Sequence, residues 1–257
     1  MSGRLSNKVA LITGSSRGIG RATALAFAKE GTALIGVHYA NNADAAQATV
    51  HEIEALGVKA VAIKANLRTG KEATDSIWEQ FRAAVIATTG EPLLDILVNN
   101  AGIAPAISLA QTSEAVFDEV VTINLKAPFF LIQTLADHIR NNGRIINIST
   151  GFTRVAAPTH PVYAASKGAI ETLTLALAPV FGHRGITVNT VMPGVTETDM
   201  NAEWMAIPEA RAGAEAMSVF SRVGQAADVA DIIVLVASNE AHWTTGQVID
   251  ATGGARL

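Results

Sequence analysis

Short apolar segments rich in β-branched residues alternate with longer amphipathic segments along the whole chain. Seven apolar segments predict strands, at residues 9–13, 33–37, 59–63, 94–99, 144–149, 187–191 and 247–250. Several of them show no polar alternation, which is typical of strands that are buried on both faces of a sheet. Helices are predicted between the strands, at residues 18–30, 43–56, 71–88, 114–141, 162–181 and 227–237. Pro128 lies inside the segment 114–141 and should bend or interrupt that helix.

This alternation predicts the fold class. Strands separated by helices form βαβ units, with parallel strands and right-handed crossovers. We therefore expect an α/β fold, a single doubly wound Rossmann-type domain over residues 1–257. Its seven-stranded parallel sheet, in the order 3-2-1-4-5-6-7, should carry helices on both faces. The irregular segment 193–220 is expected to form a substrate lid around residues 194–220 rather than a second domain.

Composition removes several classes of function. The 257 residues are 49% apolar and 16% charged, which excludes a disordered chain. The net charge of −4 leaves no basic excess for nucleic acid. With no cysteine, disulfides and cysteine-bound zinc are excluded, and His51-Glu52 has no second histidine at the spacing of a zinc protease, so we expect no metal. There is neither a signal-peptide pattern nor a run of 18 apolar residues, so a cytoplasmic protein without a membrane partner is expected.

A glycine-rich turn joins the first predicted strand to the first predicted helix. Its sequence is TGSSRGIG, at residues 13–20. Glycines at such a turn let backbone N–H groups approach a pyrophosphate, and the helix N-terminus adds a favourable dipole. The turn alone also suits an ordinary strand-to-helix connection, so it indicates a dinucleotide only together with other motifs.

A tyrosine and a lysine are spaced for one face of a helix. Tyr163 and Lys167 are four residues apart in a segment that predicts a helix. An ammonium group beside a phenol favours the phenolate, so we expect the pKa of Tyr163 to be lowered toward neutrality. A phenol with such a pKa can act as an acid or a base.

These motifs together resemble the short-chain dehydrogenase/reductase family. The turn at 13–20 is followed by Asn-Asn-Ala-Gly at 99–102, by Tyr163 and Lys167, and by Pro-Gly at 193–194. The resemblance is to the shorter-chain branch of the family and extends from residue 8 to residue 254. It implies that Tyr163 is the proton donor and acceptor, that Lys167 holds the nicotinamide ribose and that Asn124 orders a proton-relay water.

The resemblance also implies which residues surround the cofactor. The turn at 99–102 should close over the adenosine side, and the Pro-Gly loop with Thr198 should touch the nicotinamide. The cofactor-binding residues expected in this way are Gly14, Ser16, Arg17, Gly18, Ile19, Gly20, His38, Tyr39, Asn41, Asn66, Leu67, Asn100, Ala101, Gly102, Tyr163, Lys167, Pro193, Gly194, Val195 and Thr198.

One catalytic position departs from the family pattern. The family's serine, 13 residues before the tyrosine, is replaced by Thr150, which follows Ser149. Neighbouring residues of a strand face opposite sides. We expect Thr150 to face the substrate carbonyl and Ser149 to face away. Thr150 keeps the hydroxyl, and its methyl group narrows the pocket.

The second strand ends without the acidic residue that binds an NAD ribose. The sequence there is VHYANN, at residues 37–42. No carboxylate would repel a 2′-phosphate, Arg17 can supply positive charge, and the Asn41 and Asn42 amides can donate hydrogen bonds. We therefore expect NADP(H) rather than NAD(H). Asn66 stands where relatives carry an aspartate beside the adenine.

The sequence thus predicts an NADP(H)-dependent oxidoreductase that interconverts a ketone and a secondary alcohol. The substrate is a small molecule, and the side chains expected to line its pocket are Ile103, Ala104, Phe152, Val155, Val195, Trp204 and Met205. One alternative is a 3-oxoacyl-[acyl-carrier-protein] reductase. Arg184 agrees with that activity, but such enzymes usually have an arginine at the position of Asn141. Another is a non-catalytic NADP-binding protein. The resemblance further implies a homotetramer, which the apolar segment 172–180 supports.

Overall fold

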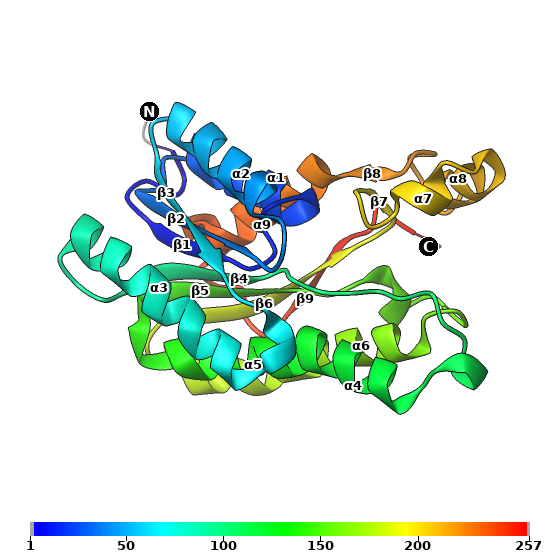
Figure 1. The fold of residues 1–257 in the computed structure, drawn as a ribbon. Coiled ribbons are helices and arrows are strands. Elements are labelled where there is room, and N and C mark those ends of the chain that lie inside the picture. The colour runs from blue at the N-terminus through cyan, green and yellow to red at the C-terminus, as the bar shows by residue number, and fades with distance from the viewer. Residues whose placement is uncertain (1–2, 256–257) are drawn as a thin grey trace.

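Seven parallel strands form the central sheet of the computed structural model, which describes residues 3–255 (Figure 1). The strands are β1 (Val9–Ile12), β2 (Leu34–Tyr39), β3 (Lys59–Lys64), β4 (Leu94–Asn99), β5 (Ile139–Ile148), β6 (Thr187–Pro193) and β9 (Val248–Ala251). Their order across the sheet is β3-β2-β1-β4-β5-β6-β9. Every neighbouring pair is parallel. The predicted α/β fold class and strand order are confirmed.

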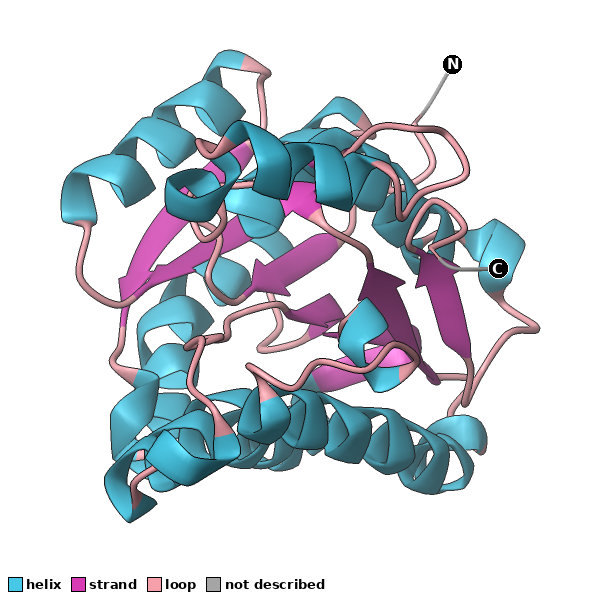
Figure 2. Cartoon of the chain, turned by 90° about the vertical axis from the view of Figure 1, so that its right-hand side faces the viewer, coloured by secondary structure: helices cyan, strands magenta, loops and turns pink. Residues whose placement is uncertain are grey.

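Helices cover both faces of the sheet (Figures 1 and 2). One layer holds α1 (Gly18–Lys29), α2 (Ala43–Ala55) and α9 (Ala226–Ala237). The opposite layer holds α3 (Lys71–Thr89), α4 (Glu114–Val121), α5 (Ala127–Leu135) and α6 (Pro161–Gly182). No helix among residues 3–255 is both long and apolar enough to cross a membrane.

The alternation of side chains along β1 explains why both faces need cover. Val9 and Leu11 pack in one apolar core with Phe81 of α3. Ala10 and Ile12 belong to the other core. All four β1 side chains are fully buried, because successive residues of a strand point to opposite faces. Such a strand has no room for polar alternation, as its sequence indicates.

The predicted helix 114–141 is interrupted beside Pro128, as expected, but it ends earlier than predicted. A π-helical turn, Thr122–Lys126, separates α4 from α5, and Pro128 lies in the first turn of α5. Proline is tolerated there because the first backbone N–H groups of a helix have no partner within the helix. The helical segment then ends before Ile139, where β5 begins.

The segment after β6 forms a small unit of its own. It contains β7 (Thr196–Glu197), α7 (Ala202–Met205), α8 (Pro208–Glu215) and β8 (Gly224–Gln225), with β7 and β8 paired. Met205, Ala214 and Val223 form its separate apolar cluster. In Figure 1 this unit projects from the sheet over the carboxyl ends of the strands.

Candidate active site

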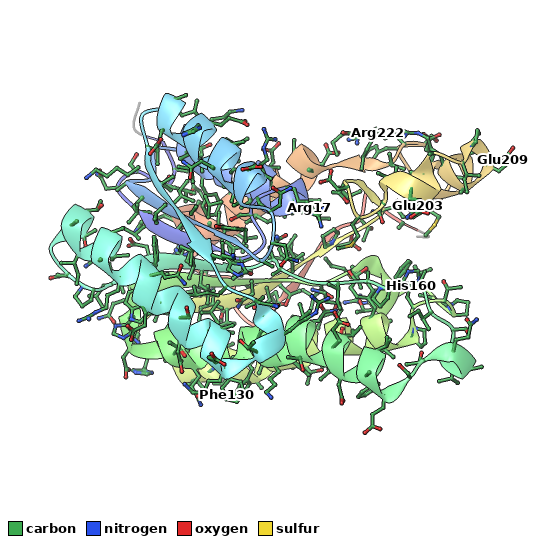
Figure 3. All side chains as sticks on the ribbon, viewed as in Figure 1. Arg17, Phe130, His160, Glu203, Glu209 and Arg222 are labelled. Atoms are coloured by element: carbon green, nitrogen blue, oxygen red, sulfur yellow. The ribbon has the colours of Figure 1, made fainter. Side chains whose placement is uncertain are left out.

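A cavity of about 990 Å³ lies at the carboxyl ends of the parallel strands. Residues that follow β1, β2, β4, β5 and β6 line it, together with side chains of α6 and of the unit after β6. In Figure 3, Arg17 and Glu203 lie on the upper side of this cleft and His160 lies on its lower side. Open parallel sheets bind ligands at this edge, near the point where the strand order reverses. Here that point lies between β1 and β4.

The turns after β1 and β4 are fastened to each other. The side-chain amide of Asn100 donates to the carbonyl oxygens of Thr13, at 2.9 Å, and Gly14, at 3.0 Å. The Thr13 hydroxyl accepts from the backbone N–H groups of Asn100 and Ala101, both at 3.0 Å. Gly14 has φ +64°, and a Cβ there would lie 2.9 Å from the Ala101 Cα. The close approach of the two turns therefore requires glycine at position 14.

Helix α6 brings Tyr163 and Lys167 to the cavity. Pro161 begins the helix, and the four-residue spacing puts both side chains on one face. The Lys167 Nζ donates to the Ile148 carbonyl oxygen at 2.8 Å and lies 6.0 Å from the centre of the Tyr163 ring. Burial lowers the pKa of Lys167 to about 8.

The predicted fall in the pKa of Tyr163 is wrong. Burial of the phenol group raises this pKa above its ordinary value, and the hydroxyl of Thr150 lowers it by a smaller amount. The Lys167 ammonium is directed at the end of β5 rather than at the phenol oxygen. Tyr163 is therefore an undissociated phenol near neutral pH, which is the form that can donate a proton.

The two hydroxyl residues after β5 have different surroundings. The Thr150 side chain lines the cavity, and its oxygen accepts from the Phe152 N–H at 3.4 Å, so its proton remains available for another acceptor. Ser149 is buried and donates to Glu171 on α6 at 2.6 Å. Both residues line the cavity, but the Ser149 hydroxyl already donates to Glu171, so Thr150 carries the hydroxyl that is available to a ligand.

Comparison with known proteins identifies the family to which the chain belongs. The model of the short chain dehydrogenase family matches residues 8–208. This chain belongs to the short-chain dehydrogenase family.

Individual relatives of the family match nearly the whole chain. A short chain dehydrogenase named mdpC from Emericella nidulans is 38% identical, over 98% of this chain and 96% of that protein. The crystal structure of the angucycline C-6 ketoreductase LanV with bound NADP is 41% identical, with a TM-score of 0.94, over 99% of this chain and 97% of that one. The promiscuous reductase LugOII, which catalyses keto-reduction at C1 in lugdunomycin biosynthesis, is 43% identical with a TM-score of 0.94, over 99% and 100%.

Asn124 lies behind the cavity of this short-chain dehydrogenase rather than in its wall. Its amide donates to the Ile103 carbonyl at 2.9 Å and to the Ser166 hydroxyl at 3.1 Å, and its carbonyl accepts from the Ile103 N–H at 2.9 Å. A Cβ on Gly102 would lie 3.2 Å from the Asn124 Oδ1 and 3.3 Å from the Lys167 Nζ. The π-helical turn therefore places Asn124 where it joins α6 to the turn after β4, in keeping with the frequent occurrence of π turns at functional sites.

Most of the predicted site residues surround the cavity. Thr150, Tyr163, Lys167 and every predicted cofactor-binding residue except Gly20 line it. A Cβ on Gly20 would lie 2.3 Å from the Gly14 carbonyl oxygen, so this glycine allows the turn to close. Of the predicted pocket side chains, Met205 is the exception, since it is buried in the apolar cluster of the segment after β6.

His160 was not predicted and forms part of an aromatic wall. Its ring centre lies 5.2 Å from that of Phe152 and 6.3 Å from that of Tyr163, and the Phe152 and Tyr163 rings meet edge to face. All three side chains line the cavity. The sequence gives no sign of this cluster, because the three residues come from a 3-10 turn, a loop and a helix whose relative positions depend on the fold.

His38 supports the glycine-rich turn instead of presenting its ring to a ligand. Its Nδ1 accepts from the Gly14 N–H at 3.0 Å, and its Nε2 lies 3.1 Å from the Ala65 carbonyl oxygen. Both ring nitrogens are thus occupied by the chain, and the imidazole is buried. Burial lowers the pKa of His38 from 6.5 to about 4. His38 thus lines the cavity, as expected of a cofactor-binding residue, but its ring nitrogens are both used within the protein.

We predict that protonation of His38 lowers the stability of this short-chain dehydrogenase at acidic pH. The pKa of His38 is lower in the folded protein than in the unfolded chain. The contribution of neutral His38 to the free energy of unfolding is therefore complete above pH 6.5 and is lost as the pH falls from 6.5 to 4. The loss should be about 3 kcal/mol in the free energy of unfolding. His38→Asn should lower stability at pH 7 and remove this part of the pH dependence in urea titrations. His51→Asn, on the exposed side of α2, is the matched control. Equal pH slopes for the wild type and His38→Asn would contradict the assignment.

Proposed function

We propose that the protein is an NADP(H)-dependent oxidoreductase that reduces a ketone to a secondary alcohol, and that it catalyses the reverse reaction as well. The observation that carries the proposal is the meeting of Tyr163, Thr150 and Lys167 in one cavity beside the glycine-rich turn. A proton donor, a hydroxyl and an ammonium group there suit carbonyl reduction next to a dinucleotide. The bound NADP in LanV and the keto-reduction named for LugOII agree with this assignment.

The residues present fit a dinucleotide phosphate. Gly14 and Gly18 both have positive φ, so the turn keeps its backbone open toward the N-terminus of α1, where an anion is favoured. Arg17 is exposed beside it, 3.7 Å from Asp199, and Asn41 and Asn42 line the end of β2. These groups would hold the 2′-phosphate, and Asn66 would lie beside the base. Bound there, the cofactor supplies the hydride for reduction or accepts it in oxidation.

Tyr163 is assigned the role of proton donor. Its raised pKa keeps the phenol protonated at neutral pH, so it can donate to the carbonyl oxygen as negative charge develops there. Thr150 adds a second hydrogen bond to the same oxygen. In the absence of substrate the Thr150 hydroxyl bonds to the phenol and lowers its pKa; with a ketone bound, its single proton would go to the carbonyl oxygen instead.

Lys167 is assigned to the ribose and to the charge balance of the site. With a pKa of about 8 it remains mainly protonated at pH 7, although it is buried. Its hydrogen bond to Ile148 uses one of three ammonium protons and leaves two for cofactor and solvent. A positive charge near the Tyr163 ring favours the phenolate after the proton has left.

The cavity favours a planar, mainly apolar ketone. Phe152, His160 and Tyr163 form its aromatic wall, and Trp204 and Ile207 line it from the segment after β6. Flat ring systems stack on such walls, with ring centres 4.5–7 Å apart. The segment 194–220 would cover this substrate as a lid, as its position over the strand ends suggests.

An acyl-carrier-protein reductase would need a basic patch to bind its acidic carrier, and Arg184 does not provide one. Arg184 donates to the Ala136 carbonyl at 2.6 Å, to the Asn141 side chain at 3.1 Å and to the Ile139 carbonyl. Its guanidinium thus serves the chain's own backbone rather than an acidic carrier. A non-catalytic role is disfavoured because Tyr163 and Thr150 line the same cavity as Lys167, and a module that only binds the dinucleotide would not need a phenol and a hydroxyl at that place.

Tyr163→Phe tests the proposed function directly. The change removes the proton donor and keeps the aromatic ring. We expect kcat for NADPH-dependent reduction of a fused-ring ketone, such as 1-tetralone, to fall by at least ~10²-fold. The Kd for NADPH, measured by fluorescence titration, should change less than about twofold because the phenol contributes little to cofactor binding. Near-normal turnover by this variant would show that another group donates the proton.

Arg17→Ala tests the choice of cofactor. Loss of a charged hydrogen bond to the 2′-phosphate should raise the Kd for NADPH about tenfold or more, as expected for a loss of about 1.5–3 kcal/mol. The Kd for NADH should stay nearly constant. Arg21→Ala is the matched control, because Arg21 lies in the first turn of the helix that Arg17 precedes and pairs with Glu52. Equal losses for both cofactors would overturn the assignment of Arg17.

We also assign the protein a homotetrameric assembly, which exposed apolar side chains support. Leu175 and Val180 of α6 are 63% and 56% exposed, and Phe117 of α4 and Phe129 of α5 are also exposed on this layer of helices. Apolar surface gathered on neighbouring helices is typical of protein interfaces. Light scattering at micromolar concentration should give about four times the 26.7 kDa chain mass. A stable monomer would contradict this assembly.

A further inference from the structure

Glu171 lies one helical turn beyond Lys167 on α6 and faces the end of β5. Its Oε1 accepts from the Ser149 hydroxyl at 2.6 Å and from the Thr153 hydroxyl at 2.8 Å. These two donors stand on either side of Thr150 in the sequence. No residue of the expected site, and no part of the function proposed above, uses this carboxylate.

Thr153 connects Glu171 to Thr150 through hydrogen bonds. The Thr153 hydroxyl also lies 3.0 Å from the Thr150 carbonyl oxygen, so its proton is shared between that oxygen and Glu171. The segment Gly151–Thr153 is a single 3-10 turn that begins at Thr150. The Thr150 carbonyl oxygen also accepts from the backbone N–H of Thr153 at 3.2 Å, so the position of Thr150 depends on where Thr153 is held.

On the other side of Thr150, Ser149 borders the cavity but is held by hydrogen bonds within the protein. It is buried, its N–H donates to the Val191 carbonyl at 2.9 Å, and its hydroxyl meets the carboxylate. Thr150 therefore lies between two residues that are both bound to one oxygen of Glu171. Movement of either residue would rotate or displace the Thr150 hydroxyl that faces Tyr163.

We propose that Glu171 is a positioning residue that holds the Thr150 hydroxyl in the orientation required to bind the carbonyl oxygen. Glu171 does not touch the substrate, and acts through Ser149 and Thr153. A carboxylate suits this role because it only accepts hydrogen bonds, and it can accept from two hydroxyls at once. This inference rests on the proposed reduction, in which Thr150 binds the carbonyl oxygen.

The test is a double-mutant cycle between Glu171 and Thr150, with NADPH and 1-tetralone. Glu171→Leu keeps the size of the side chain and removes the acceptor. It should lower kcat by about 10- to 100-fold, the effect of a reacting group displaced by about 1 Å. Thr150→Ala alone should lower kcat by ~10²–10³-fold. Once Thr150→Ala is present, Glu171→Leu should lower kcat by less than about twofold more, because the group it positions is gone.

Three further variants separate positioning from stability. Glu171→Gln keeps a carbonyl acceptor at the same distance and should retain kcat within about threefold. Thr172→Val, the next residue on α6, is the matched control and should leave kcat unchanged, since its hydroxyl bonds only within the helix. Thr153→Val should reproduce the non-additive loss with Thr150→Ala, and it replaces Glu171→Leu in the cycle if the leucine variant does not fold. The Kd for NADPH should be the same in all of them.

The outcomes are distinct. Losses that multiply in the double variant would overturn the inference, and so would an unchanged kcat in both Glu171→Leu and Thr153→Val. A wild-type enzyme that reduces none of a panel of ketones with NADPH would instead overturn the proposed function.

Discussion

The attachment of α6 to the carboxyl end of β5 determines where the reacting groups of this protein lie. Tyr163, Lys167 and Glu171 follow one another at four-residue intervals, so they share one face of the helix. Lys167 bonds to Ile148, and Glu171 bonds to Ser149. Two of the three side chains therefore fix the helix to the strand, and the third is left to face the cavity.

A buried polar row beneath the cavity strengthens this attachment. The Asn99 amide donates to Asn147 at 2.9 Å, and the Asn147 amide donates to the Thr174 hydroxyl of α6 at 2.8 Å. Thr174 in turn meets Thr190 of β6, also at 2.8 Å. These side chains are nearly inaccessible to solvent, so a shift in register would leave buried polar groups without partners. The row thus ties three strands and α6 into one arrangement, which leaves the site little freedom to deform.

Features that depend on local periodicity could be predicted from the sequence, and features that depend on packing could not. The strand segments, their order, the glycine-rich turn and the spacing of Tyr163 and Lys167 are all local signals, and the structure has the strand order and the turn as predicted, although β5 begins at Ile139, five residues before the predicted strand. The end of the helix before Ile139 was missed because the residues from 136 to 141 carry no glycine or proline to stop it. The roles of Glu171 and His160 were missed because their partners lie on other elements of the fold. The pKa of Tyr163 was predicted in the wrong direction because burial, which no motif reports, outweighs a lysine directed elsewhere.

In the proposed reaction, a hydride would pass from the cofactor to the carbonyl carbon of a ketone in this cavity. Reduction of 1-tetralone or a related fused-ring ketone with NADPH that carries deuterium at C4 of the nicotinamide tests it most directly. The account predicts that one of the two C4 positions, and only one, delivers its deuterium to the carbinol carbon of the product, as detected by mass spectrometry. An alcohol product that carries no deuterium from either labelled cofactor, or that takes its carbinol hydrogen from heavy water, would contradict the account.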